Sequence, residues 1–244
     1  MKNQYVNISE DFQKARQMPI TEFLEVPSVI AALGPINGKS LIDFACGEGF
    51  FTRIWKKLGA EKVVGLDLSP EMISLATQQE QKNPLGIGYI VSDASIKQRI
   101  GRFDIATAIF LFNYANDIEA LSRMMENVFI NLENGGRLIA VVPNPDFING
   151  QKNTLTYGYF IEELSSDPSS IKVKMTFTGD KSFSIEFTQW SREVYEKTLT
   201  ETGFADISWV PFSVSDEGIR KLGSEYWRAT LENPKSIILT ATKK

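Results

Sequence analysis

Short apolar runs alternate with helical segments between residues 40 and 142, and this alternation is the feature that most constrains the fold. The runs have the length and composition of buried strands, and they lie at 40–45, 62–68, 87–92, 103–110 and 137–142. Helical patterns separate several of them, at 50–58, 70–81 and 117–132. Strands that alternate with helices predict βαβ units with parallel strands and right-handed connections. We therefore expect a doubly wound α/β sheet that binds its ligand outside the carboxyl ends of the strands.

The rest of the chain predicts additions around this core. Apolar and polar residues alternate at 172–178 and 183–189 on either side of Gly179 and Asp180, which predicts an antiparallel hairpin. A helix at 191–202 and strands at 207–211 and 236–241 would complete a mostly parallel seven-stranded sheet with a final antiparallel strand. The interpretation divides the chain into an N-terminal helical cap at 1–39, broken at Pro19 and Pro27, the core at 40–149, an inserted α+β lid at 150–190, and a C-terminal helix and strands at 191–244.

The composition excludes several kinds of chemistry. The sequence has no histidine, so a Ser-His-Asp triad, a Cys-His pair and a histidine-ligated metal site are ruled out, and no tight carboxylate cluster indicates another metal site. With 26 basic and 30 acidic residues, the net charge of −4 argues against nucleic acid or an anionic membrane as the main partner. No apolar run is long enough to span a membrane, and residues 1–10 lack the apolar core of a signal peptide. We expect a cytoplasmic protein that is a monomer or a homodimer.

Acidic residues stand at the ends of three successive predicted strands. Asp43 precedes a turn that contains Gly47 and Gly49, which allow the backbone to approach a ligand closely. Asp67 ends the second strand, 20 residues after Gly47, where a carboxylate can accept hydrogen bonds from both hydroxyls of a ribose. Asp93 follows the third strand, where a carboxylate can accept from the amine of an adenine. The alternatives are that Asp67 caps the next helix and that Asp93 is a solvated loop residue.

The chemistry of this predicted pocket favours an adenosyl ligand with little negative charge. Few basic residues lie near the turn to meet phosphate groups. Met72 lies one helical turn beyond Asp67, where it can pack on an adenine face or serve as an ordinary core residue. Cys46 lies within the turn without a basic partner in sequence, so we interpret it as a small filler and not as a nucleophile.

The same segment resembles the class I S-adenosylmethionine-dependent methyltransferases. The resemblance covers about 40–142, and it is carried by the residues at 41–49, 64–69, 92–94, 103–105 and 132–137. More narrowly, the chain is similar to bacterial small-molecule methyltransferases of the toxoflavin-synthase type, through the residues at 45–53 and 111–115 and through Tyr5, Ile8, Glu10 and Phe12. Two positions depart from the pattern, because Ala45 replaces the first glycine of the turn and Val6 replaces an acidic residue.

This resemblance implies S-adenosylmethionine as the cofactor and S-adenosylhomocysteine as the product. It implies that Asp43 anchors the turn near the methionine amino group, that Asp67 binds the ribose, and that the backbone of Phe110 faces the amino group. The cofactor-binding residues expected from it are Asp43, Ala45, Gly47, Gly49, Asp67, Leu68, Met72, Asp93, Ala94 and Phe110. Arg16 and Arg53 are further candidates for the cofactor carboxylate, with ion pairing elsewhere as the alternative.

A small-molecule acceptor is expected, methylated mainly by proximity and desolvation, because the methyl group is already activated and no histidine base exists. No catalytic residue is assigned. Asn113 is the best polar candidate for acceptor binding, since it follows the fourth strand, and the aromatic candidates are Tyr114, Tyr157, Tyr159, Trp190, Trp209, Tyr226 and Trp227. The resemblance favours N-methylation of a heterocycle, and transfer to oxygen or carbon stays open.

Two other functions share parts of this pattern. A nicotinamide-dependent oxidoreductase on a Rossmann sheet has a glycine turn and an acid after the second strand, but Phe50 lies where its motif requires a small residue. A non-catalytic adenosyl-binding protein would keep the pocket without the chemistry.

Overall fold

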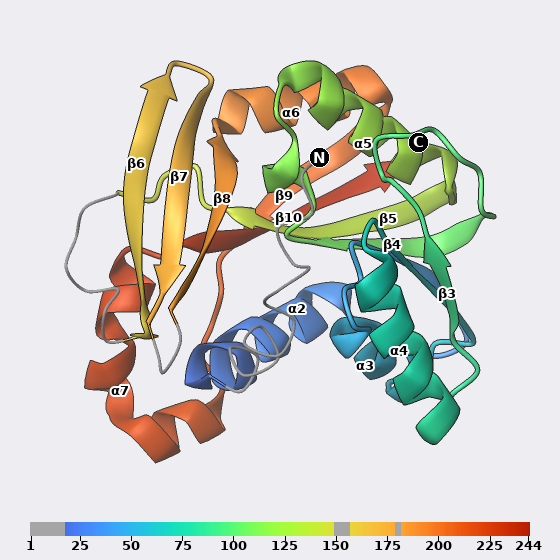
Figure 1. The fold of residues 1–244 in the computed structure, drawn as a ribbon, viewed down its shortest axis with the longest axis horizontal. Helices are drawn as coiled ribbons and strands as arrows, with labels where there is room; N and C mark the ends of the chain where they lie inside the picture. Colours follow the sequence, from blue (N-terminus) through green and yellow to red (C-terminus); the bar gives the residue numbers. More distant parts are fainter. Residues whose placement is uncertain (1–17, 149–156, 179–181) are drawn as a thin grey trace.

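The computed structural model describes residues 18–148, 157–178 and 182–244 (Figure 1). Its main sheet has seven strands in the order β3-β2-β1-β4-β5-β10-β9, and a second sheet has three strands in the order β6-β7-β8. This confirms the predicted α/β fold with a mostly parallel seven-stranded sheet. The predicted helical segment before Met18 and the hairpin turn at Gly179 and Asp180 lie outside the described residues.

The parallel strands match the predicted runs closely. They are β1 (Ser40–Phe44), β2 (Lys62–Asp67), β3 (Gly88–Val91), β4 (Phe103–Ile109) and β5 (Leu132–Pro143). β1 pairs with β2 on one side and β4 on the other, so the order of the strands reverses at β1, which is where open α/β sheets bind their ligands. β5 starts earlier than predicted, because Leu132 already pairs with Phe103 before the register shifts.

The C-terminal strands close the sheet as expected. β10 (Ser236–Lys243) runs antiparallel between β5 and β9 (Phe204–Val210). Ser236 at the start of β10 pairs with Pro143 at the end of β5. The segment that enters β10 therefore lies at the carboxyl end of β5, which is the edge of the sheet where a ligand is expected.

Helices cover both faces of the main sheet. They are the π-helix η1 (Thr21–Glu25), α2 (Val26–Leu33), α3 (Phe50–Lys57), α4 (Pro70–Lys82), the 3-10 helix η2 (Phe112–Tyr114), α5 (Ile118–Ile130), α6 (Arg192–Thr202) and α7 (Asp216–Glu232). Buried residues of α5 and α6 share one core cluster, and those of α2, α3 and α7 share another. Ser69 caps α4 by accepting the Met72 N–H at 3.2 Å. No helix in the described ranges is both long and apolar enough to cross a membrane.

The second sheet stands beside the main sheet (Figure 1). It contains β6 (Tyr159–Asp167), β7 (Ser170–Phe177) and β8 (Phe183–Trp190), all paired antiparallel. The β7–β8 pairing confirms the predicted hairpin. β6 was not predicted, because most of its residues are exposed and polar and carry no alternating pattern. β8 packs on η2 and β5, so this sheet covers the carboxyl ends of β4 and β5.

Candidate active site

The turn after β1 has the open geometry that a bound ligand requires. Ala45, Gly47 and Gly49 all have left-handed backbone conformations, with φ of 58°, 57° and 86°. A Cβ on Gly47 would meet no atom within 4 Å, so this part of the turn faces free space. A Cβ on Gly49 would lie 2.4 Å from the hydroxyl oxygen of Tyr89, so the opposite side of the turn is closely packed. The turn thus presents bare backbone to one side and is supported from the other.

Asp43 ties this turn to its surroundings. Its side chain is buried, and its two oxygens accept hydrogen bonds from the hydroxyls of Thr107 and Thr52, each at 2.6 Å. These bonds join β1 to the neighbouring strand β4 and to the first turns of α3. The sequence analysis did not identify either threonine. The available signal was a hydroxyl within the apolar run of β4 and another on the buried side of α3.

Asp67 is held in place by the backbone on both sides. One carboxylate oxygen accepts the Gly47 N–H at 2.8 Å, and the other accepts the Ser69 N–H at 2.9 Å. A carboxylate has about four lone-pair sites, so Asp67 can still accept a hydroxyl group of a ligand. Burial raises the pKa of the Asp67 carboxyl above its usual range, against the opposing effect of the backbone N–H groups of Ser69, Gly47 and Leu68. The alternative that Asp67 caps the next helix is therefore true in part, because Asp67 accepts the backbone N–H of Ser69, the residue that caps α4.

Asp93 and Ala94 belong to a loop that is fastened from α5. One oxygen of Asp93 accepts the backbone N–H and the hydroxyl of Ser95, at 2.8 and 2.7 Å. The amide of Asn127 donates to the carbonyl of Ala94 at 3.1 Å, and the oxygen of Asn131 accepts the Ile100 N–H at 2.7 Å. Both asparagines are buried and were missed in the sequence. The sequence feature that could have identified them is a pair of asparagines four residues apart, on the otherwise apolar face of the predicted helix at 117–132.

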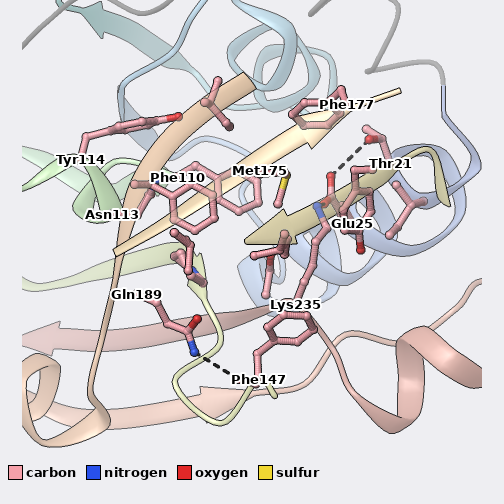
Figure 2. A pocket seen from close by; sticks show the side chains of 18 of the residues that line it. Thr21, Glu25, Phe110, Asn113, Tyr114, Phe147, Met175, Phe177, Gln189 and Lys235 are labelled. Carbon is pink, nitrogen blue, oxygen red and sulfur yellow. Dashed lines mark hydrogen bonds and ion pairs between the residues drawn. The ribbon is translucent and has the colours of Figure 1, made fainter. Parts of the chain in front are cut away.

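A pocket opens where the two sheets meet, next to the end of β4 (Figure 2). It contains about 910 Å³ of atom-free space, part of it continuous with solvent. The main-sheet side contributes Phe110, Asn113, Tyr114, Pro143, Phe147, Lys235 and Ser236. The second sheet contributes Tyr159, Ile161, Val173, Met175, Phe177, Ile185, Phe187 and Gln189, and the N-terminal helical segment contributes Met18, Ile20, Thr21 and Glu25. A mostly apolar wall with a few polar groups is typical of small-molecule sites.

The polar groups of the pocket have distinct environments. Asn113 is 2% exposed, and its side-chain oxygen has no hydrogen-bond partner among the described residues. Glu25 and Lys235 form an ion pair of 3.4 Å within the same pocket. The amide of Gln189 instead donates to the carbonyl of Asn144 at 2.9 Å and fastens the loop after β5. The unpaired oxygen of Asn113 is costly to bury, and a ligand donor would satisfy it.

The predicted acceptor residues divide into two groups. Asn113, Tyr114 and Tyr159 line the pocket. Tyr157 and Trp190 are not among its described lining residues, because the Tyr157 hydroxyl donates to the carbonyl of Tyr226 at 2.6 Å and the Trp190 indole donates to the carbonyl of Phe112 at 3.3 Å. Both are packing residues in this structure. The remaining aromatic candidates Trp209, Tyr226 and Trp227 also lie outside the pocket lining.

The remaining residues singled out in the sequence either have structural partners or lie outside the described residues. Arg53 forms an ion pair with Glu80 and also donates to the carbonyl of Asn83 at 2.7 Å, so it joins α3 to the end of α4. Arg16 lies outside the described residues. Cys46 is buried, and burial with the nearby charge of Asp43 raises the pKa of its thiol, which fits the interpretation of a small filler.

Comparison with known proteins agrees with this geometry. Residues 42–140 match the methyltransferase domain family. The chain is 30% identical over 146 residues to an uncharacterised protein of Haemophilus influenzae, across 57% of this chain and 56% of the relative. It is 32% identical over 101 residues to the ribosomal protein L11 methyltransferase of Burkholderia multivorans, across 41% of this chain and 31% of the relative. The chain thus spans about half the length of the first relative and about a third of the second.

The solved structures show the same fold. An amino pentose methyltransferase from Micromonospora echinaspora, solved with S-adenosylmethionine bound, superposes with a TM-score of 0.62 at 18% identity, across 100% of this chain and 100% of that one. The fold is the Rossmann-like fold of class I S-adenosylmethionine-dependent methyltransferases. The match of residues 42–140 to the methyltransferase domain family agrees with this fold.

Proposed function

We propose that this protein transfers a methyl group from S-adenosylmethionine to a small-molecule acceptor bound in the pocket between the two sheets, and that the methylated atom is a nitrogen. The observation that carries the proposal is the apolar pocket at the end of β4, with the unpaired side-chain oxygen of Asn113 in its wall. The cofactor supplies a methyl group activated by its bond to a positively charged sulfur. The chain's own residues bind and orient the acceptor and exclude water from it.

The residues at the ends of β1, β2 and β3 fit the cofactor. The free space at Gly47 accommodates its methionyl part, the spare lone pairs of Asp67 suit the ribose hydroxyls, and Asp93 retains an oxygen with no partner among the described residues for the adenine amine. We assign cofactor binding to the predicted set of Asp43, Ala45, Gly47, Gly49, Asp67, Leu68, Met72, Asp93, Ala94 and Phe110. Phe110 joins the two halves of the site, because it directly follows β4 and also lines the acceptor pocket.

The shape of the pocket supports a small acceptor. Its inner wall is the face of β6–β8 that carries Val173 and Met175, so the second sheet covers the carboxyl edge of the main sheet. We assign the role of a lid to this insertion at 150–190. A protein acceptor, such as the one named for the L11 relative, would need an open edge, whereas the space here is enclosed from two sides.

Glu25 is the carboxylate in the described pocket lining, and it is paired with Lys235 away from Asn113, which supports nitrogen as the methylated atom. An amide oxygen accepts an N–H but does not take up a proton, so a hydroxyl acceptor would keep its proton during attack. Burial and the charge of Glu25 raise the pKa of Tyr159, which keeps its hydroxyl protonated. A neutral nitrogen attacks with its lone pair as the carbon–sulfur bond breaks, and it loses its proton to water afterwards. The similarity of 111–115 to toxoflavin-synthase-type enzymes points the same way.

Filling the pocket tests the proposal. Val173 is 1% exposed and points into the pocket, whereas its neighbour Lys172 is exposed on the other face of β7. We expect Val173→Trp to abolish formation of S-adenosylhomocysteine from a panel of planar N-heterocycles while leaving calorimetric binding of S-adenosylhomocysteine within about twofold, and Lys172→Trp to change neither. Turnover that survives Val173→Trp would contradict the assignment of this pocket. Binding of NAD in place of S-adenosylhomocysteine would contradict the cofactor.

A further inference from the structure

We propose that Lys235 and Glu25 form a subsite for a neutral carbonyl oxygen of the acceptor, so that the acceptor is a planar apolar molecule carrying an amide, lactam or ketone group. The inference rests on the proposed function, because it places this group in the acceptor pocket. Neither residue was identified in the sequence analysis. They are 210 positions apart in the chain, and only the fold brings them together.

The two charges are held inside an apolar environment. The side chains of Lys235 and Glu25 are 13% and 9% exposed, and the ammonium nitrogen lies 3.4 Å from the nearer carboxylate oxygen. The ammonium also lies over two aromatic rings, 5.0 Å from the centre of Tyr159 and 5.8 Å from that of Phe110. The backbone fixes its base, because the carbonyl of Lys235 accepts the Asn144 N–H at 2.9 Å. The position of the charge is thus determined by β5, β6 and η1 together.

The ammonium has donors to spare. Lys235 carries three N–H groups, and the described residues offer them one carboxylate at ion-pair distance and two ring faces but no hydrogen bond. The second oxygen of Glu25 is occupied by the Thr21 hydroxyl at 3.2 Å, so the carboxylate is fixed on η1. A buried charge is stable when it is both paired and hydrogen-bonded, and here the hydrogen bonds are incomplete. A ligand oxygen in the pocket would complete them.

The charge balance decides which oxygen fits. Glu25 and Lys235 are the charged residues in the described pocket lining, and their charges cancel. A carboxylate on the ligand would leave a net negative charge beside Glu25 in a poorly hydrated space, and like charges repel strongly there. A carbonyl oxygen accepts from the ammonium without this repulsion. The site therefore favours a neutral carbonyl compound over an anionic one.

The subsite and Asn113 lie at different ends of the pocket. In Figure 2, Asn113 and Tyr114 lie on one side of the Phe110 ring, and Glu25 and Lys235 lie on the other. An acceptor that donates an N–H to Asn113 and accepts from Lys235 is fixed at two points, with its apolar body on Phe110. Two-point binding of this kind selects which nitrogen of a heterocycle meets the methyl group.

A set of matched probes tests the subsite. The probes are quinoline, the planar lactam 2-quinolone and quinoline-2-carboxylate, each titrated by calorimetry into protein saturated with S-adenosylhomocysteine. The test variant is the double substitution Glu25→Gln with Lys235→Met, which removes both charges at similar volume and leaves no lone buried charge. The control is Glu217→Gln with Lys221→Met, an exposed ion pair of 2.7 Å on α7. Thermal unfolding checks that both variants are folded.

In the wild type we expect 2-quinolone to bind about tenfold or more tightly than quinoline, as one hydrogen bond to a charged group provides, and quinoline-2-carboxylate to bind more weakly than 2-quinolone. The preference for the lactam should disappear in the pocket variant and persist in the control. Equal binding of the lactam and quinoline by the wild type, or a preference that survives in the pocket variant, would overturn the subsite.

The Val173→Trp variant separates this failure from failure of the proposed function. Suppose that the wild type binds 2-quinolone and quinoline equally well and that Val173→Trp blocks both. The assignment of the pocket is then supported, and only the subsite is wrong. If no probe binds the wild type, or if all bind Val173→Trp equally well, both proposals fall.

Discussion

Replacing Asp67 with asparagine or alanine probes the cofactor half of the site most directly. The carboxylate accepts the Gly47 and Ser69 N–H groups at 2.8 and 2.9 Å, and its remaining lone-pair capacity would bind the proposed ribose. A hydrogen bond to a charged group contributes about 1.5–3 kcal/mol, so we expect Asp67→Ala to weaken S-adenosylhomocysteine binding by about 10- to 150-fold. Asp67→Asn should fall between alanine and the wild type, because it keeps one acceptor but turns an amino group toward Gly47.

The assay must separate lost binding from lost stability, since either substitution also removes hydrogen bonds within the chain. Asp104 provides a matched control: its carboxylate accepts the backbone N–H and the hydroxyl of Ser40, both at 2.8 Å, at the amino ends of β1 and β4. Asp104→Asn should lower the melting temperature and leave calorimetric affinity for S-adenosylhomocysteine within about twofold. Unchanged affinity in Asp67→Ala, or an equal loss in Asp104→Asn, would refute the ribose assignment.

Three further predictions concern the same half of the site. Burial raises the pKa of Asp67 in the folded chain, so this carboxylate takes up a proton at a higher pH than an exposed aspartate does. The affinity for S-adenosylhomocysteine should therefore fall as the pH drops through that raised value. Asp67→Asn should show no such fall. Gly49→Ala should destabilise the chain by about 1–3 kcal/mol in denaturant unfolding, since its Cβ would lie 2.4 Å from the Tyr89 hydroxyl at a φ of 86°, and Tyr89→Phe should restore part of the loss. Asn127→Leu should loosen the loop at Ala94 and weaken S-adenosylhomocysteine binding severalfold, whereas Asn127→Asp, which keeps an acceptor for the Gln98 N–H, should weaken it less.

The main sheet could be predicted because its signals are local. Each parallel strand contains a short apolar run that ends in a turn or loop, and two of the helices have a start signal, Ser69 before α4 and Asp117 before α5. The second sheet was only half predicted. β7 and β8 alternate apolar and polar residues, but β6 presents exposed, mostly polar residues beyond Ile161, and these continue the backbone pairing with β7. Backbone pairing leaves no pattern in a sequence.

The two halves of the site differ in the same way. The residues proposed to bind the cofactor could be predicted from their positions, because ligands of such sheets bind at the carboxyl ends of the parallel strands. Acidic residues and glycines at those ends can be identified one strand at a time. The acceptor half has no such rule. Asn113 could be proposed because it lies shortly after β4, but the pair of Glu25 and Lys235 joins a π-helix to the residue before β10. In the sequence, neither Glu25 nor Lys235 can be distinguished from an ordinary charged surface residue. The proposed acceptor specificity depends on contacts between distant segments, so it could not be predicted from the sequence.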